Sequence, residues 1–317
     1  MLRYAAGRIA LTLPVLFGVS VMSFAIIHLI PGDIVSVLAG PTVGVHSQAA
    51  QNIRHALHLD QPLPVQYGIW LMGALHGDFG NSLIFGLPVG PQIAEHLPVT
   101  LVLTALSLIF SIAIGVPGGV VAATTRGRWP DLTIRTVALL GLSTPAFFVG
   151  VAAVLLLSIY LPWFKTLGTV DLHGDPLGSL ETLLLPAFVL SLPSATTVMR
   201  YTRVAMLEVL AEPYMATARA KGAGRLRVLI RHGLRNALLP VVTAIGVTAA
   251  QLVAGAVVIE QVFGLPGVGQ LMLNAIYHRD YTQVQATVLV VTTLVVLINI
   301  LVDFSYYLLD PRIQQHG

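Results

Sequence analysis

Long runs without a charged side chain alternate along the chain with short segments that hold most of its polar residues. A helix that crosses a bilayer needs about 20 mostly apolar residues. Six runs free of Asp, Glu, Lys and Arg meet this requirement, over residues 9–30, 99–125, 136–164, 182–199, 236–259 and 281–302. The pattern therefore predicts an all-α integral membrane protein with six transmembrane helices.

Two further segments are short of charge but do not fit a membrane span. Residues 34–53 include Gly40, Pro41 and several amide and hydroxyl side chains, which is typical of a loop. Residues 65–77 number only 13, too few to cross a bilayer, so they are expected to form a surface or interfacial helix. The first apolar run is too long for the core of a cleavable signal peptide, and we expect it to stay as a helix.

Prolines stand close to the predicted start of three spans. Pro98, Pro186 and Pro240 each follow a leucine and precede an apolar run. Proline in the first turn of a helix gives up no hydrogen bond, because those N–H groups have no partner within the helix. The sequence thus favours ordinary helix starts at these prolines, and the alternative is a kink inside a longer helix.

The composition agrees with this pattern and excludes two other classes of protein. Hydrophobic residues make up 56% of the chain and charged residues only 10%, whereas an average soluble protein is about a quarter charged. Intrinsic disorder requires low hydrophobicity and high charge, so it is excluded as well. The absence of cysteine excludes disulfides, thiolate metal sites and cysteine nucleophiles.

The charges divide unequally between the two sides of the predicted membrane domain. With a cytoplasmic N-terminus, six spans return the C-terminus to the cytoplasm, and the inside segments then hold 14 of the 17 basic residues but only four acids. The outside segments hold three basic residues and nine acids. Because cytoplasmic loops carry an excess of Lys and Arg, this distribution predicts that both termini are cytoplasmic.

Two connections between spans are long enough to form structure of their own. Residues 31–98 make a large first extracytoplasmic loop, expected to fold as a small subdomain between the first span (1–30) and a core of five spans (99–317). The cytoplasmic segment 200–235 carries eight of the inside basic residues. These two segments are the places where contacts with other proteins are expected.

The cytoplasmic segment has the signals of a short helix. Glu212 and Pro213 can begin it, since proline suits the first turn and an acid suits the positive end of the helix dipole. Gly222 and Gly224 can end it, since glycine adopts the left-handed conformation of a helix stop. Small side chains on one face would let another protein approach closely; the equally weighted alternative is a basic helix that lies on anionic lipid.

Several blocks follow one another in a fixed order through nearly the whole chain. They are Met1-Leu2-Arg3-Tyr4, Ile30-Pro31-Gly32-Asp33, Leu59-Asp60-Gln61-Pro62, Gly77-Asp78-Phe79-Gly80-Asn81-Ser82, Tyr214, Thr217-Ala218-Arg219-Ala220-Lys221-Gly222, Leu234-Arg235-Asn236-Ala237, Glu260, Pro266-Gly267-Val268-Gly269 and Leu309-Asp310-Pro311-Arg312-Ile313. In this order they resemble the permease subunits of binding-protein-dependent ABC importers, specifically the dipeptide/oligopeptide/nickel permease family. The cytoplasmic blocks resemble the "EAA" loop of that family, with Ala216-Thr217-Ala218 in place of Glu-Ala-Ala, a change typical of the peptide branch.

The resemblance implies a non-catalytic subunit of an ATP-hydrolysing transport complex in a prokaryotic plasma (inner) membrane. The chain has no G-x-x-x-x-G-K-[ST] phosphate loop, so it is not expected to hold ATP itself. The implied partners are two cytoplasmic ATPase subunits that bind ATP and Mg, a second homologous permease, an extracytoplasmic substrate-binding protein and membrane lipid. No cofactor, metal or nucleic acid is expected on this chain.

The resemblance also implies that the short cytoplasmic helix docks in a groove on one ATPase. The coupling residues would be Glu212, Tyr214, Ala216, Thr217, Ala218, Arg219, Lys221 and Gly222. Closure of the ATPases on ATP would push this helix as a rigid body and rock the spans between inward-open and outward-open states.

Polar side chains within the spans are candidates for the translocation path. Ser143 and Thr144 lie in the third span, and Thr248 and Gln251 in the fifth; hydrogen bonding between helices is the favoured alternative role for them. Asn299 and Asp303 are spaced i, i+4 near the inner end of the sixth span and are candidates for a gate or for pairing with arginine.

The substrate is the least determined feature. Di- and oligopeptides are favoured by the branch of the family, and nickel chelates, glutathione and opines remain alternatives. His55 and His58 share a helical spacing that would suit nickel, but no carboxylate or cysteine completes an evident metal site. A membrane protease is disfavoured because H-E-x-x-H is absent, and a stand-alone channel or secondary transporter because intramembrane charge is scarce.

Overall fold

The structure is a computed structural model that describes residues 2–29, 51, 60–164, 170–222 and 224–309. Its helical elements are α1 (Leu2–Leu29), α4 (Leu63–Leu75), α5 (Val89–Thr124), α6 (Trp129–Ser143), α7 (Ala146–Val154), η1 (Leu155–Tyr160), α8 (Pro176–Ala211), α9 (Pro213–Ala220), α10 (Arg225–Arg227), η2 (Val228–Leu234), α11 (Arg235–Phe263), α12 (Val268–His278) and α13 (Tyr281–Leu309). The two η segments are π-helical. In this part of the chain the only pairing of extended backbone is one isolated bridge between Asn81 and Pro88, so the all-α prediction is confirmed.

Among the residues that the structure describes, four helices are long and apolar enough to cross a membrane. They are Val89–Thr124, Pro176–Ala211, Pro240–Phe263 and Tyr281–Val302, and a bent pair of helices, Trp129–Ser143 with Ala146–Tyr160, could supply a fifth. The first predicted span lies within α1, whose apolar segment Leu11–Ala25 is shorter than these. Most of the predicted loop 31–59 lies outside the described residues.

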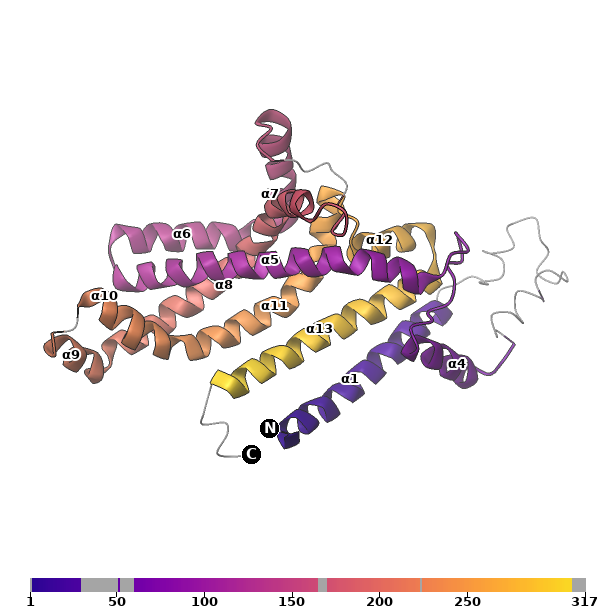
Figure 1. Ribbon diagram of the computed structural model, residues 1–317, viewed down its shortest axis with the longest axis horizontal. Coiled ribbons are helices and arrows are strands. Elements are labelled where there is room, and N and C mark those ends of the chain that lie inside the picture. Colours follow the sequence, from indigo (N-terminus) through magenta and orange to yellow (C-terminus); the bar gives the residue numbers. More distant parts are fainter. Residues whose placement is uncertain (1, 30–50, 52–59, 165–169, 223, 310–317) are drawn as a thin grey trace.

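The third predicted span, residues 136–164, is sharply bent rather than one straight helix. α6 ends at Ser143, α7 begins at Ala146, and the two axes differ by 96°. Thr144 is extended, with φ −92° and ψ 123°, because the ring of Pro145 disfavours the helical conformation in the residue before it. Figure 1 shows the result: α6 runs beside α5, while α7 points in another direction and packs on α8 and α11.

The prolines at the predicted span starts lie inside helices, so that prediction is also wrong. Pro98 is within α5, Pro186 within α8 and Pro240 within α11. Each helix starts earlier because the polar residues ahead of the apolar run are helical too. Transmembrane bundles tolerate an internal proline where neighbouring groups satisfy the freed carbonyls. The true start of α8 is capped by Asp175, whose side chain accepts a hydrogen bond from Gly178 N.

Close contact between α5 and α8 forms the centre of the bundle. A Cβ atom on Gly115 would lie 2.7 Å from the Ala195 carbonyl oxygen, and one on Gly119 would lie 2.5 Å from Thr202 Cβ. Glycines spaced by four residues allow two membrane helices to approach this closely. Large apolar side chains fill the neighbouring core; they include Leu103, Leu183, Leu190, Leu252 and Ile259, which come from α5, α8 and α11.

The helices α1 and α13 lie side by side on the opposite side of α11 from α5 (Figure 1). Ser23 Oγ of α1 donates a hydrogen bond to the Gln285 carbonyl of α13 at 3.1 Å. The predicted surface helix is α4, which has no buried residue. It is attached to α1 by a 2.7 Å hydrogen bond between the hydroxyls of Tyr67 and Ser20.

Candidate coupling site

The short helix predicted between the fourth and fifth spans has the limits that its sequence predicts. Glu212 is extended, with φ −69° and ψ 141°, and ends α8. Pro213 then begins α9, which continues to Ala220. Gly222 has a left-handed φ of 79°, which only glycine adopts at little cost. In Figure 1, α9 lies at one end of the bundle, where the chain turns from α8 back toward α11.

A buried methionine and one hydrogen bond attach α9 to the two long helices. Met215 has no exposed surface, and its Cε atom lies close to Gly233, where Met206 of α8 also packs. Asn236 Nδ2 of α11 donates a hydrogen bond to the Tyr214 hydroxyl at 2.8 Å. These contacts hold α9 on α8 and α11 from its buried side.

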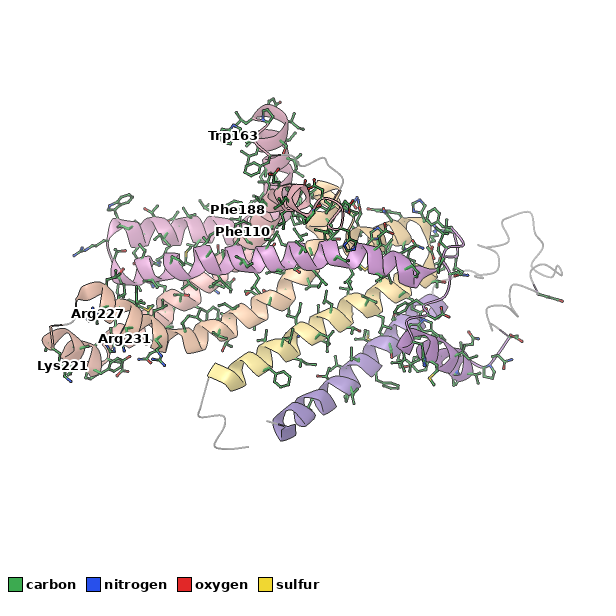
Figure 2. The ribbon with its side chains drawn as sticks, in the orientation of Figure 1. Phe110, Trp163, Phe188, Lys221, Arg227 and Arg231 are labelled. Atoms are coloured by element: carbon green, nitrogen blue, oxygen red, sulfur yellow. The ribbon has the colours of Figure 1, made fainter. Side chains whose placement is uncertain are left out.

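The opposite side of α9 offers small and basic side chains to solvent. Ala216, Thr217, Lys221 and Gly222 are exposed, and Ala218 is half-buried. Arg227 and Arg231 extend the basic surface along α10 and η2 (Figure 2). Of the predicted coupling residues, Glu212 and Tyr214 are also exposed, and the side chain of Arg219 lies outside the described set. A surface of this kind suits close contact with an acidic protein groove.

The connection from α9 to α11 contains a π-helical turn, Val228–Leu234. π-Helical turns are rare and occur often at functional sites. Here the wider turn places Gly233 against Met206, whose Cε would lie 3.3 Å from an added Cβ. Residues Met215 and Gly233 were not predicted as site residues, because nothing in the sequence marks a single methionine as an anchor.

The candidate path residues do not meet one another in this structure. The hydroxyls of Ser143, Thr144 and Thr248 donate to the carbonyls of Leu139, Leu140 and Ala244, each four residues earlier on its own helix. In the described part of the chain these three hydroxyls thus donate along their own helices, and hydrogen bonding between helices stays a prediction. Thr248 is buried and Gln251 is exposed, although both belong to α11.

The inner end of α13 carries the candidate gate residues. Asn299 is exposed, and Asp303 is one turn further along the same helix, with its side chain outside the described set. Among the described residues no group of three His, Cys, Asp or Glu side chains is placed to hold a metal. His55 and His58 fall outside that part of the chain.

Two buried carboxylates organise the opposite end of the bundle. Glu260 is fully buried, accepts a 2.7 Å hydrogen bond from the Thr100 hydroxyl, and accepts another from Gln270 N at 3.1 Å. Thr100 Oγ1 also accepts from Val268 N. Glu260 therefore joins α5 to the turn between α11 and α12. The sequence resemblance included Glu260, but its burial and its partner 160 residues away were not predicted.

Asp280 has a similar role at the start of α13. It is buried, and its carboxylate accepts hydrogen bonds from the Ser82 hydroxyl and from Leu83 N. Ser82 belongs to the tight loop that the Asn81–Pro88 bridge closes. This loop is thus attached directly to the start of the last long helix.

A third carboxylate joins α6 to α8 at the end of the bundle that carries α9. Arg203 Nε and Nη2 donate to the two carboxylate oxygens of Asp131 at 2.8 and 2.9 Å. Gly127 N donates to the same carboxylate at 3.1 Å. Asp131 is only 2% exposed, so this ion pair is the main polar connection between the α5–α6 turn and α8.

Comparison with known proteins agrees with this geometry. Residues 115–315 match the model of the binding-protein-dependent transport system inner membrane component family, and residues 1–104 match the corresponding N-terminal model. The chain is 43% identical over 306 residues to a putative peptide transport system permease protein of Brucella suis biovar 1 (strain 1330), covering 96% of this chain and 97% of that protein. It is 38% identical over 314 residues to the glutathione transport system permease protein GsiC of Escherichia coli (strain K12), covering 99% of each.

A solved structure shares the fold of the core. A chain of the MetNI methionine ABC transporter in an inward-facing conformation superposes with a TM-score of 0.56 at 22% identity, over 69% of this chain and 96% of that chain. The apolar helices and the family match over most of the length lead to one identification. The chain belongs to the family of binding-protein-dependent transport system inner membrane components, and it is a multi-pass inner-membrane permease of an ABC importer.

Proposed function

We propose that this permease moves short peptides into the cytoplasm and that α9 is the element through which partner ATPases drive it. The observation that carries the proposal is the two-sided character of α9. Its buried side is fixed to α8 and α11 through Met215 and Tyr214, and its other side exposes small and basic side chains. A helix held in this way moves with both long helices rather than bending independently.

The partners follow from this arrangement and from the family. We propose two cytoplasmic ATPase subunits, which bind ATP and Mg, a second homologous permease subunit and an extracytoplasmic substrate-binding protein. Closure of the ATPases displaces α9, and the close packing of α8 on Gly115 and Gly119 of α5 carries the displacement into the bundle. The substrate then gains access alternately from the two sides of the membrane.

We propose six spans with both termini cytoplasmic, in which α1 supplies the first span and the bent α6–α7 pair supplies the third. The orientation is supported by Figure 1, where the start of α1, the end of α13 and α9 lie toward one side of the bundle, and α4 and α12 toward the other. The proposed units are 1–30, the extracytoplasmic loop 31–98 and the core 99–317, with the coupling segment 200–235.

The translocation path is proposed to lie on the surface that the second permease covers. Gln251 is exposed on α11, and Ser143 and Thr144 stand at the bend between α6 and α7. Thr248, although buried, supports the same face of α11. Asn299 and Asp303 are proposed as the inner gate. Exposed polar groups in an apolar span are suited to this role, because they require water, substrate or a partner protein.

The coupling role is tested by charge substitutions on α9 in the importer reconstituted into proteoliposomes. Gly222→Asp and Ala218→Arg are expected to abolish peptide uptake and to uncouple ATP hydrolysis from it, because both place bulk and charge in the docking surface. Gly224→Asp is the matched control: Gly224 has open space around it and no left-handed φ. Normal uptake by either α9 variant, with normal membrane insertion, would refute the docking role.

The substrate class is tested on the partner binding protein. Two of the chain's relatives are a peptide permease and a glutathione permease, and glutathione is itself a short peptide, which supports a peptide substrate. Mass spectrometry of small molecules that co-purify with the binding protein is expected to identify short peptides. A nickel chelate or an opine in their place would change the substrate and leave the coupling role of α9 intact.

A further inference from the structure

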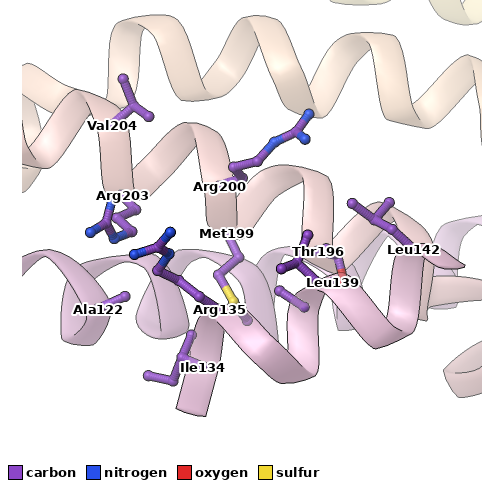
Figure 3. A pocket seen from close by; sticks show the side chains of 11 residues that line it. Ala122, Ile134, Arg135, Leu139, Leu142, Thr196, Met199, Arg200, Arg203 and Val204 are labelled. Atoms are coloured by element: carbon purple, nitrogen blue, oxygen red, sulfur yellow. The ribbon is translucent and has the colours of Figure 1, made fainter. Parts of the chain in front are cut away.

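The ion pair between Asp131 and Arg203 borders a cavity of about 260 Å³ that none of the proposed transport steps uses. The cavity lies between α5, α6 and α8, and Figure 3 shows its lining side chains. Besides Arg203, the lining includes Arg135, Ala138, Leu139, Leu142, Met199 and Arg200. Ala122, Ile134, Thr196 and Val204 complete it.

Charge is concentrated at one end of the cavity. In Figure 3, Arg135 and Arg203 lie near each other at one end of the row of lining side chains, and Leu142 lies at the other. Arg135 and Leu142 are seven residues apart on α6, which corresponds to about 10 Å along a helix. The arginines therefore lie toward the end of the cavity nearer the start of α6, which is the predicted cytoplasmic end. The end at Leu142 has no charged side chain.

The positive charge at this end exceeds what the protein neutralises. Both oxygens of Asp131 are occupied by Arg203, and the same carboxylate also accepts from Gly127 N. Arg135 and Arg200 are exposed and have no ion-pair partner among the residues whose side chains the structure describes. Two cations beside a cavity thus remain available to an anion.

The outer surface of α6 beside the cavity is apolar. Leu139 and Leu140 are more than 60% exposed, and Trp129, at the start of the helix, is 77% exposed. Tryptophan is enriched where a membrane protein crosses the boundary between headgroups and hydrocarbon. The apolar end of the cavity is therefore continuous with a surface suited to acyl chains.

We propose that this cavity is a binding site for an anionic phospholipid of the cytoplasmic leaflet. Arg135 and Arg200 would bind the phosphate of the headgroup, and one acyl chain would enter between Met199, Leu139 and Leu142. The cavity is smaller than typical sites for drug-sized ligands. It would therefore admit the phosphate and the first part of one acyl chain, and the remainder of the lipid would lie along α6. Basic pockets between helices on the cytoplasmic side are suited to anionic headgroups.

The site adds to the proposed transport function without depending on the transported substrate; it rests only on the proposed orientation. A lipid held here would contact α5, α6 and α8 together, at the end of the bundle that carries α9. The bound lipid would stabilise the position of α6 relative to α8. A zwitterionic lipid lacks the net negative charge that two unpaired arginines select.

The test measures lipid retained by the purified full-length chain and by two pairs of variants. The chain is extracted in mild detergent and titrated with phosphatidylglycerol or phosphatidylcholine, and bound lipid is counted by native mass spectrometry. Arg135→Gln with Arg200→Gln is expected to weaken phosphatidylglycerol binding about 30-fold, since each basic residue near an anionic surface contributes about fivefold. Arg227→Gln with Arg231→Gln removes the same charge from exposed positions outside the cavity and is expected to change binding little.

A second pair of variants changes the shape of the cavity and leaves the charge unaltered. Ala138→Phe fills the cavity and is expected to displace the lipid, while Leu140→Phe places the same side chain on the exposed face of α6 and retains it. Equal losses in the two double-arginine variants would mean general attraction of lipid to a basic surface, and equal binding of phosphatidylcholine would mean no selection of charge; either result would overturn the site. Retention by Ala138→Phe, or cross-linking of position 135 to the second permease in the assembled importer, would also overturn it. Normal peptide uptake alongside any of these results would leave the transport function standing.

Discussion

The pairing of Asp131 with Arg203 provides the sharpest test of how α6 is held on α8. The two residues are 72 positions apart and are joined by two charge-assisted hydrogen bonds of 2.8 and 2.9 Å. The perturbation is a double-mutant cycle with Asp131→Ala, Arg203→Ala and the combined variant. A cycle of this kind isolates the interaction of two residues from their separate contributions.

The expected magnitude follows from the geometry and the burial of the pair. Hydrogen bonds to charged groups contribute about 1.5–3 kcal/mol each, and the side chains of Asp131 and Arg203 are only 3% and 19% exposed. Because Arg203 regains part of its hydration when its partner is removed, the lower end of that range applies. Each single variant is expected to lose about 3 kcal/mol of unfolding free energy, as for other broken buried pairs, and the coupling energy is expected to be about 2–3 kcal/mol.

The assay is reversible unfolding of the purified permease in mixed micelles, followed by circular dichroism. Glu95→Ala serves as the control, because it removes an exposed carboxylate from α5 and is expected to change the unfolding free energy little. The two single losses should not add in the combined variant. Additive losses, or a coupling energy below about 0.5 kcal/mol, would refute the reasoning that this ion pair fixes α6 on α8.

Four further outcomes are expected. Gly119→Ala should destabilise the bundle by about 1–3 kcal/mol, because its Cβ would lie 2.5 Å from a side chain of α8; Gly68→Ala, with open space around it, should be neutral or slightly stabilising in the same unfolding assay. Glu260→Ala should cost about 2–4 kcal/mol, since a hydroxyl and backbone N–H groups lose their buried acceptor. Asp280→Ala should release the loop at Ser82 and Leu83 and speed limited proteolysis within that loop; a variant that is cleaved no faster than the unaltered protein would contradict this expectation. Tyr214→Phe should lower uptake per ATP hydrolysed, because α9 loses one of its attachments; unchanged coupling would show that Met215 alone is enough.

The sequence predicted the helical elements well where local signals were strong. The uncharged runs located most of the long helices, although four helices and a bent pair qualify as spans where six had been predicted. The short helix Pro213–Ala220 has the limits set by Pro213 and by the left-handed Gly222. The 13-residue apolar run is the surface helix α4. These features depend on composition and backbone preference over a few residues, so they can be predicted without knowledge of the fold.

Predictions that needed knowledge of neighbouring helices were less successful. Proline was expected at helix starts, but Pro98, Pro186 and Pro240 are internal, because packed membrane helices accept a missing hydrogen bond. At Pro145 the same residue type separates α6 from α7 by 96°. One sequence signal thus has two structural outcomes, and the surrounding contacts select between them.

By itself, the sequence determined the class of protein, the unequal distribution of its charge along the chain and the limits of the short helix Pro213–Ala220. Apolar length, the distribution of Lys and Arg and the order of short blocks are properties of the chain alone. The tertiary structure alone decided how that helix is anchored, where the third span bends and which carboxylates are paired. Thr100 with Glu260, Ser82 with Asp280 and Asp131 with Arg203 are separated by 160, 198 and 72 residues. Such pairs form because a buried polar group in an apolar bundle must find a partner, and only the packing of whole helices determines which partner is within reach.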